Sequence, residues 1–255
     1  GFIGLEIAAS LRSLNKAVTV IESRERLLAR ALPPMLAQYI AARHRDEGVE
    51  FVFNAEVAAF AGGGAGVESV RLANGRTVAA DLVIVGIGVV PNMELALQAG
   101  IACQNGITVD AFARTSDARI YAAGDCAWHP NAFAGGMARL ECVQNAVDQG
   151  RLAGANAAGG QSAYAATPWF WSDQYDMKLQ MAGIPHPHDE VVMRGRMQDG
   201  AFSLFYLRAG RLAAVESVNR PADHMQARKL LAAGAELAPG QAADPDFDLR
   251  GALRR

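Results

Sequence analysis

The chain has 255 residues, of which 51% are hydrophobic and 20% are charged, and its formal net charge is −2. This composition is typical of a globular protein with enough apolar material for one large or two modest cores. A small negative charge gives no overall attraction to nucleic acid or to an anionic membrane. The longest apolar run, Leu82 to Pro91, is about half of the roughly 20 residues that a membrane-spanning helix needs, and no leader is visible, so we expect a cytoplasmic protein.

The first fifty residues alternate between helix and strand patterns. A helix is predicted over residues 1–14, because apolar side chains recur there at helical spacing: Ile3, Ile7, Leu11 and Leu14. An apolar strand with an acidic end follows at 17–22. A second helix at 35–47 begins after two prolines and stops at Gly48, and it leads into a strand at 49–53. This βαβ rhythm predicts a parallel sheet.

Residues 56–80 interrupt that rhythm and predict a small antiparallel meander, with Asn74-Gly75 as a hairpin turn. Asp81 to Ile87 is then predicted as a buried strand that ends in a glycine turn. A helix is expected at 93–99. Further on, a short strand at 120–123 is predicted to end in Gly124-Asp125.

The last third of the chain predicts a separate α+β domain. An alanine-rich helix at 140–158 and a linker at 159–167 precede it, and a helix from about Pro221 to Ala233 follows its strands. Four of those strands should form an antiparallel sheet: Met177–Ala182, Glu190–Met197, Phe202–Leu207 and Leu212–Val218.

The start of the chain carries part of a dinucleotide fingerprint. Gly1-Phe2-Ile3-Gly4 matches its last two glycines, where backbone amides at a helix start can face a pyrophosphate. Tight helix–strand packing would explain the same glycines equally well. Glu22 ends the next strand eighteen residues after Gly4, where a carboxylate would accept from a ribose 2′-hydroxyl, and this favours NADH over NADPH. Arg24 and Arg26 leave open a pairing with a 2′-phosphate.

Two further turns suggest nucleotide contacts. Gly86-Ile87-Gly88 follows a predicted strand, at the carboxyl end where open α/β sheets bind ligands, although it could be a bare strand-to-helix turn. Gly124-Asp125 is typical of the way a flavoprotein presents a carboxylate to the ribityl and pyrophosphate arm of FAD. A helix cap or a surface turn is the structural alternative for Asp125.

Thiol and metal chemistry have little support. The chain has three cysteines, Cys103, Cys126 and Cys142, and they lack the spacing of a redox pair or a metal knuckle. We therefore expect reduced cysteines that serve in packing, and a reactive thiol remains the open alternative. The pair His186-Pro187-His188 is expected to be a polar loop, and no metal site is predicted.

Taken together, these segments resemble a known family. Gly1 to Glu6, Val85 to Asn92, Ile120 to Asp125 and above all Trp169-Phe170-Trp171-Ser172-Asp173-Gln174 resemble the FAD-dependent NADH:ferredoxin reductases. These include the reductase components of aromatic-ring dioxygenases and the putidaredoxin reductase-like proteins, within the pyridine nucleotide-disulfide oxidoreductase superfamily. The resemblance covers essentially the whole chain, and the tryptophan-rich stretch is shared with apoptosis-inducing factor.

The patterns and the resemblance predict an α/β protein with a Rossmann-like NAD-binding domain, which includes the antiparallel meander, and a C-terminal α+β domain with an antiparallel sheet. The NAD-binding domain would cover 1–105 without its first strand, the distal part of a FAD-binding domain 106–160, and an interface domain 161–255. The N-terminal FAD-binding part of the family would be missing. We therefore expect the 255-residue chain alone to be neither a stable holoenzyme nor an active reductase.

The resemblance also implies roles for individual residues. Asp125 would bind FAD, and backbone groups near Val143 would reach the isoalloxazine edge. Trp171 would lie against the flavin and Glu141 near the nicotinamide, while Glu6 would stand beside flavin N5, paired with a lysine outside this chain. Glu6 and Trp171 are the candidate catalytic residues. The candidate cofactor-binding residues are Gly1, Ile3, Gly4, Glu22, Gly86, Ile87, Gly88, Gly124, Asp125, Glu141, Val143 and Trp171.

The function implied by the resemblance is the transfer of electrons from NADH through FAD to a [2Fe–2S] ferredoxin that feeds an oxygenase or a cytochrome P450. Ferredoxins are acidic, so one hypothesis is a basic rim that binds the ferredoxin, and the alternative is that the charges are scattered over the surface. The candidate rim residues are Arg208, Arg211, Arg220, Arg228 and Lys229. Two other functions remain open at this stage. One is an NADH oxidase or disulfide-type reductase of the same superfamily, and the other is an NADH-responsive binding protein like apoptosis-inducing factor.

Overall fold

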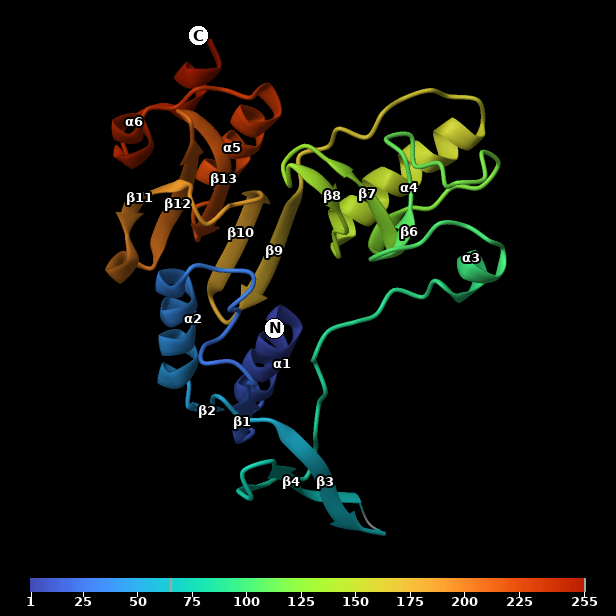
Figure 1. Ribbon diagram of the computed structural model, residues 1–255. Coiled ribbons are helices and arrows are strands. Elements are labelled where there is room, and N and C mark those ends of the chain that lie inside the picture. The colour runs from blue at the N-terminus through green and yellow to red at the C-terminus, as the bar shows by residue number, and fades with distance from the viewer. Residues whose placement is uncertain (65, 255) are drawn as a thin grey trace. The chain divides into compact units, whose positions relative to one another are not determined.

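The computed structural model describes residues 1–64 and 66–254, and its elements are labelled in Figure 1. The chain divides into two compact units. Unit 1 consists of Gly1–Val89 together with Ser172–Asp176, and unit 2 consists of Val90–Trp171 together with the chain from Met177 onward. The short segment 172–176 is the tip of a hairpin whose remainder belongs to unit 2.

Unit 1 begins with the predicted helix and strand alternation. Strands β1 and β2 pair in parallel, with Val18 opposite Val49, so the predicted parallel sheet is confirmed. Helix α1 packs on β1 and helix α2 packs on β2. The bounds of these elements are α1 Phe2–Ser13, β1 Val18–Ile21, α2 Pro34–Asp46 and β2 Val49–Val52.

The predicted meander follows as a three-stranded antiparallel sheet in the order β3-β4-β5, with bounds β3 Val57–Gly63, β4 Gly66–Leu72 and β5 Thr77–Ala79. The Asn74-Gly75 turn is confirmed, since the Asn74 Oδ1 accepts a hydrogen bond from the Arg76 N–H at 3.0 Å and Gly75 has a φ of 84°. Positive φ is the reason that glycine suits this turn position.

The prediction of a buried strand at 81–87 is wrong. This segment forms no strand in the described part of the chain, and its apolar side chains other than Val83 are exposed, with 93% exposure for Ile87. A strand exists only through the ladder that it makes with a partner. No described residue supplies that ladder, so a strongly apolar pattern alone does not produce a strand here.

Unit 2 opens with helix α3 and a small three-stranded sheet in the order β6-β7-β8. The sequence did not predict this sheet, but the long helix α4 that follows it agrees with the helix predicted at 140–158. The bounds are α3 Glu94–Gln98, β6 Ile107–Thr108, β7 Ala127–Asn131, β8 Gly136–Ala138 and α4 Val143–Ala157, with a 3₁₀ turn η1 at Gly124–Cys126.

The predicted strand at 120–123 is also wrong. Only one isolated bridge, between Tyr121 and Arg114, forms there. The segment folds back on residues 113–115 through the hydrogen bonds Thr115 N–H to Ile120 O at 2.9 Å and Ala122 N–H to Ala113 O at 3.1 Å. Gly124-Asp125 therefore follows a loop and not a strand, and the next strand, β7, begins at Ala127.

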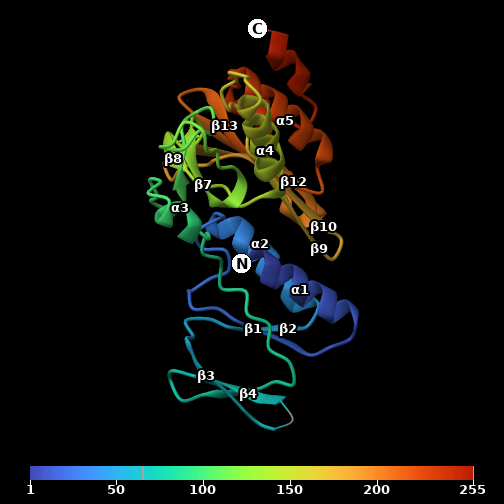
Figure 2. The same cartoon turned by 90° about the vertical axis from the view of Figure 1, so that its right-hand side faces the viewer.

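The C-terminal antiparallel sheet confirms the predicted fold class. Its five strands have the order β11-β12-β13-β10-β9, and helix α5 packs on β13 and β10 (Figure 1, Figure 2). The bounds are β9 Trp169–Gln174, β10 Met177–Gly183, β11 Glu190–Arg196, β12 Ala201–Arg208, β13 Arg211–Val218, α5 Pro221–Ala233 and α6 Pro239–Ala243, with 3₁₀ turns η2 at Met197–Asp199 and η3 at Leu249–Arg254.

Buried polar groups hold this domain together beside its apolar core. Arg194 forms an ion pair with Asp223 at 3.3 Å, and its guanidinium also donates to backbone carbonyls of the C-terminal segment, including that of Phe247 at 2.9 Å. Tyr206 donates a hydrogen bond of 2.6 Å to the carboxyl group of Glu216, and both side chains are buried. Buried charges need such partners. In the described chain, no helix combines the length and the apolarity that crossing a bilayer requires.

Candidate functional site

The two glycine turns of unit 1 lie against each other. A Cβ atom added to Gly1 would lie 3.9 Å from the Gly86 carbonyl oxygen, and one added to Gly86 would lie 3.8 Å from the Gly4 Cα. Gly1 is the N-cap residue of α1, and no side chain caps the first amides of that helix. Free amides at a helix start favour an anion such as a phosphate. The structure therefore brings together backbone groups that the sequence places 85 positions apart, Gly1 and Gly86.

Glu22 directly follows β1, at the carboxyl end of the parallel pair. Its N–H donates to the Val52 carbonyl at 2.9 Å, and its carboxylate accepts from the Arg24 N–H at 3.0 Å. These bonds fix a half-exposed acid at the carboxyl end of the strand. Its remaining acceptor capacity can receive a hydroxyl group.

Arg26, the alternative partner for a 2′-phosphate, is occupied inside unit 1. Its guanidinium donates to the backbone carbonyls of Leu27 at 3.3 Å, Ala29 at 3.1 Å and Leu32 at 3.0 Å. It thus closes the loop between β1 and α2. Arg24 is exposed and remains the candidate cation in this loop.

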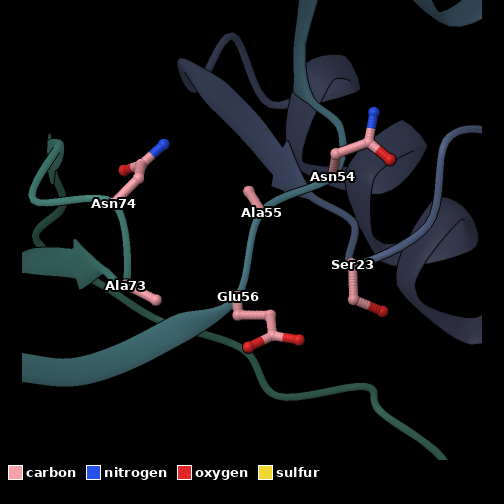
Figure 3. A pocket seen from close by; sticks show the side chains of 6 residues that line it. All are labelled: Ser23, Asn54, Ala55, Glu56, Ala73 and Asn74. Carbon is pink, nitrogen blue, oxygen red and sulfur yellow. The ribbon is translucent and has the colours of Figure 1, made fainter.

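A polar pocket of about 240 Å³ adjoins the same strand ends (Figure 3). Its lining comes from three segments: Ser23, Asn54, Ala55, Glu56, Ala73 and Asn74. The lining holds one carboxylate and two amides, but no aromatic or basic side chain. It therefore favours water or a small polar guest over a nucleotide base, which would need a stacking surface. Sequence reasoning did not identify this pocket, since no motif joins its three segments.

Glu6 contacts the tryptophan-rich motif. The Ser172 hydroxyl donates a hydrogen bond of 2.6 Å to the Glu6 carboxylate, and Ser172 is fully buried. The sequence assigned a role to Glu6 and Trp171 but none to Ser172. No local signal could reveal the contact, because 166 positions separate its partners.

In unit 2, the Gly124-Asp125 turn packs closely on helix α4. Gly124 has a φ of 80°, its N–H donates to the buried Gln149 Oε1 at 2.9 Å, and a Cβ added to it would lie 3.3 Å from the Ala146 Cβ. Only glycine adopts this conformation at this distance without strain. Asp125 is exposed, and no described residue donates a hydrogen bond to its carboxylate. The carboxylate is therefore presented outward from a rigid turn.

The start of α4 lies beside this turn. Cys142 is the N-cap residue, no side chain caps the helix, and Val143 is 62% exposed. Glu141 is exposed and forms an ion pair with Arg139. Burial raises the pKa of the Cys142 thiol, which opposes the reactive thiolate. The cysteines are all free thiols.

Trp171 presents its ring at the surface, with 38% exposure, and its centroid lies 5.4 Å from that of Trp169. Trp169 in turn carries the Arg228 guanidinium 4.3 Å from its ring centre. Of the two tryptophans, Trp171 is the one available to a ligand. Arg228 is engaged in this cation–π contact.

The hypothesis of a basic rim is weakened by internal pairing. Arg208 forms an ion pair with Asp189 at 2.7 Å, and Arg220 forms one with Asp223 at 2.9 Å. With Arg228 stacked on an aromatic ring, only Arg211 and Lys229 have no ion pair or ring contact in the described structure.

Comparisons with known proteins show which family the chain belongs to. The family model described as pyridine nucleotide-disulphide oxidoreductase matches residues 1–150, and one described as reductase C-terminal matches residues 169–253. Rhodocoxin reductase of Rhodococcus erythropolis is 47% identical over 255 residues, which is 100% of this chain and 60% of the relative. The ferredoxin–NAD(+) reductase component of the anthranilate 1,2-dioxygenase system of Burkholderia cepacia is 46% identical over 254 residues, which is 98% of this chain and 62% of the relative.

The crystal structure of the covalent putidaredoxin reductase–putidaredoxin complex matches with a TM-score of 0.94 at 35% identity, over 100% of this chain and 61% of that chain. The chain thus spans about three fifths of the length of the relatives that it matches. The resemblance seen in the sequence is confirmed: the chain belongs to the pyridine nucleotide-disulphide oxidoreductase family and carries its reductase C-terminal domain.

Proposed function

We propose that the protein is a flavoprotein reductase that passes electrons from NADH through FAD to a [2Fe–2S] ferredoxin, which serves an oxygenase or a cytochrome P450. The proposal rests on two arrangements of glycine turns and helix starts within the chain, which we assign as nucleotide half-sites. One combines the glycine turns at Gly1–Gly4 and Gly86–Gly88 with Glu22, and the other combines Gly124-Asp125 with the start of α4. Relatives that the chain matches over nearly its whole length are named as ferredoxin or rhodocoxin reductases.

The residues of the second half-site fit FAD. Gly124 has the positive φ and the close approach to Ala146 that leave no room for a side chain, and Asp125 offers a carboxylate without an internal donor. The uncapped start of α4 offers backbone amides near Val143. We assign FAD binding to these residues together with Glu141 and Trp171. Bound FAD would supply the step from a two-electron hydride donor to a one-electron acceptor.

The residues of the first half-site fit NADH better than NADPH. The amides of Gly1, Ile3 and Gly4 would face the pyrophosphate, and the Glu22 carboxylate would accept from the ribose 2′-hydroxyl. A 2′-phosphate would be repelled by the same carboxylate, and Arg26 is already bound to backbone carbonyls. The preference for NADH is thus supported by the negative charge of Glu22 and by the internal hydrogen bonds of Arg26, which leave that cation unavailable to a 2′-phosphate.

Glu6 and Trp171 are the proposed catalytic residues. Glu6 is held by Ser172, and Trp171 immediately precedes Ser172 in β9, with its ring partly exposed. Trp171 would hold the nicotinamide or flavin ring in register, since small misplacements of reacting rings lower the rate strongly. Glu6 would present its carboxylate to the reacting edge of the flavin.

The division into an NAD-binding domain at 1–105, a distal FAD-binding part at 106–160 and an interface domain at 161–255 is part of the same proposal. The proposed partners are NADH and a [2Fe–2S] ferredoxin, with no nucleic-acid or membrane partner. Such partners would place the protein in the cytoplasm.

The function is tested with the full-length, FAD-loaded protein in a steady-state assay. NADH and a candidate [2Fe–2S] ferredoxin are added, and the ferredoxin spectrum is followed, with NADPH as the matched donor control. We expect ferredoxin reduction with NADH and much slower reduction with NADPH. Flavin reduction without reduction of any ferredoxin of the host would contradict the proposal, and it would favour a disulfide-type reductase or an NADH-responsive binding protein.

A further inference from the structure

A buried chain of hydrogen bonds runs within unit 1 from the tip of the β9–β10 hairpin to Glu6. The Tyr175 hydroxyl lies 3.1 Å from the His44 Nδ1, and the His44 Nε2 lies 2.8 Å from the Gln174 Oε1. The Gln174 Nε2 donates to the Ser172 Oγ at 2.9 Å, and the Ser172 hydroxyl donates to the Glu6 carboxylate at 2.6 Å. His44, Gln174 and Ser172 are all fully buried.

The chemistry of each group gives this chain one direction. A carboxylate only accepts, so the single Ser172 hydrogen goes to Glu6, and Gln174 must donate to the Ser172 oxygen through its amide nitrogen. The Gln174 carbonyl oxygen then accepts from the His44 Nε2–H. A neutral His44 with its hydrogen on Nε2 leaves Nδ1 to accept from Tyr175. Every hydrogen bond in the chain therefore points toward Glu6.

The surroundings of His44 agree with the neutral form. Burial lowers the pKa of His44. The charged groups that face it are Arg43 and Glu47, which have opposite signs and form an ion pair with each other. Its aromatic neighbours are Tyr175, with ring centroids 4.9 Å apart, and Phe51, at 6.2 Å. Nothing in this environment demands a charged imidazole.

The hairpin tip is fixed on α2 independently of this chain. Arg43 forms an ion pair with Asp176 at 2.9 Å, and its guanidinium lies 5.0 Å from the centre of the Tyr175 ring. Tyr175 holds a φ of 56° in the two-residue turn. Ser172 and Gln174 alternate in β9 with the exposed Trp171 and Asp173, so the two buried polar residues share one face of the strand.

We propose that Ser172, Gln174 and His44 are positioning residues that hold the Glu6 carboxylate in one orientation for the hydride-transfer step. The inference rests on the proposed function, because Glu6 takes part in that step only there. No proton or electron passes through the chain in this proposal. The Arg43–Asp176 ion pair already docks the hairpin on α2, so docking does not require the buried chain of hydrogen bonds. The directed chain of donors has a further effect, because it fixes the direction in which Ser172 points its hydrogen.

The substitution Gln174→Glu in the full-length, FAD-loaded protein tests this direction. A glutamate keeps the size of the side chain and both contacts, but it can only accept, so it competes with Glu6 for the Ser172 hydrogen. We expect the rate constant for flavin reduction at saturating NADH to fall about tenfold, with the KM for NADH within about twofold of that of the wild type. Asp173→Asn, on the exposed face of the same strand, is the matched control and should leave both constants unchanged.

A second readout does not depend on turnover. The ¹⁵N NMR signals of His44 should show the neutral form with hydrogen on Nε2 in the wild type, and the imidazolium form in Gln174→Glu. If Gln174→Glu does not fold, Ser172→Ala and Ser172→Thr form the replacement pair. The alanine should lower the rate constant by a similar factor, and the threonine, which keeps the hydroxyl, should restore it.

The two proposals fail in different ways. A wild-type protein whose flavin is not reduced by NADH would contradict the proposed function. Normal flavin reduction in folded Gln174→Glu, with His44 in the imidazolium form, would contradict only the positioning role. A wild-type His44 that carries its hydrogen on Nδ1, or both hydrogens, would contradict the direction of the chain.

Discussion

The backbone N–H of Gly124 donates a hydrogen bond of 2.9 Å to the buried side-chain oxygen of Gln149. This bond ties the Gly-Asp turn to the middle of α4, whose uncapped start is the other part of the proposed FAD site. The rigidity of the turn therefore depends on a helix residue that no motif identifies. The positive φ of Gly124 and the nearby Ala146 in the same helix oppose a side chain at this turn.

We predict that Gly124→Ala lowers the affinity for FAD. Alanine at a φ of 80° costs about 1–2 kcal/mol, and its Cβ would also press on the Ala146 Cβ at 3.3 Å. The measurement is the dissociation constant of FAD from the full-length protein. The control is Gly154→Ala, at an exposed position of α4 where no atom lies within 4 Å of the added Cβ. This substitution should stabilise α4 by about 0.5–1 kcal/mol. Wild-type FAD affinity in Gly124→Ala would show that the turn is not part of the site.

Gly4→Ala should separate nucleotide binding from folding. No atom lies within 4 Å of a Cβ added to Gly4, so the fold accepts alanine, which gains about 0.5–1 kcal/mol of helix propensity within α1. The added methyl group would keep a pyrophosphate from the helix start, and we expect the KM for NADH to rise about tenfold. The KM and the free energy of unfolding are measured on the same preparation. An unchanged KM would place the pyrophosphate elsewhere.

Glu22→Gln should shift the preference between the two nicotinamide cofactors. The substitution removes the charge that would repel a 2′-phosphate, and it weakens the acceptor for a 2′-hydroxyl. We expect the ratio of kcat/KM for NADPH to that for NADH to rise about tenfold. Glu25→Gln, an exposed acid in the same loop, serves as the control for a general loss of charge. If this ratio rose equally in both variants, the result would contradict a specific role for Glu22.

Glu216 and His224 should make opposite contributions to the pH dependence of stability. Burial raises the pKa of Glu216 from its ordinary value of 4.5 to about 7, so the folded state keeps a proton that the unfolded chain releases, and the free energy of unfolding falls as pH rises through that window. Burial lowers the pKa of His224 from 6.5 to about 4, so the free energy of unfolding falls as pH decreases through that window. Each effect amounts to about 3 kcal/mol over its full range.

Single variants expose the two opposing effects between pH 4.5 and 6.5. Glu216→Gln keeps an acceptor for Tyr206 and removes the contribution that falls with pH, so its stability should rise more steeply with pH than that of the wild type. His224→Phe keeps the ring contact with Trp169 and removes a contribution that rises with pH, so the slope of its stability against pH should be less positive than that of the wild type. Urea titrations at a series of pH values, followed by pulsed hydrogen exchange in β12 and β13, give the free energy of unfolding of each variant and its slope against pH. Parallel slopes in the two variants would contradict the assignment.

The sequence predicted most elements whose pattern is local. The meander has an Asn-Gly turn between short strands, and α5 begins at a proline and ends at Gly234 with a φ of 58°, so both could be predicted from neighbouring residues. The strand predicted at 81–87 failed because a strand needs a partner, and its apolar pattern says nothing about where that partner lies. The strand at 120–123 failed because the chain reverses between Thr115 and Ile120, so this segment pairs only with residues 113–115 through an isolated bridge.

The candidate site was predictable only where a motif marks a conformation. Gly1, Gly4 and Gly124 could be proposed from the sequence, because glycines at a helix start or in a Gly-Asp turn belong to recognisable motifs. The groups that hold the motif residues were not identified, because Gln149, Ser172 and His44 act over long sequence separations and have ordinary surroundings in the sequence. Contacts of this kind come from the tertiary fold.

Anaerobic rapid mixing of the full-length, FAD-loaded protein with NADH and a [2Fe–2S] ferredoxin tests the central claim most directly. The proposed function predicts that the flavin is reduced first and that the ferredoxin is then reduced at the rate at which the flavin is reoxidised. Flavin that NADH reduces but that stays reduced in the presence of oxidised ferredoxin would contradict it.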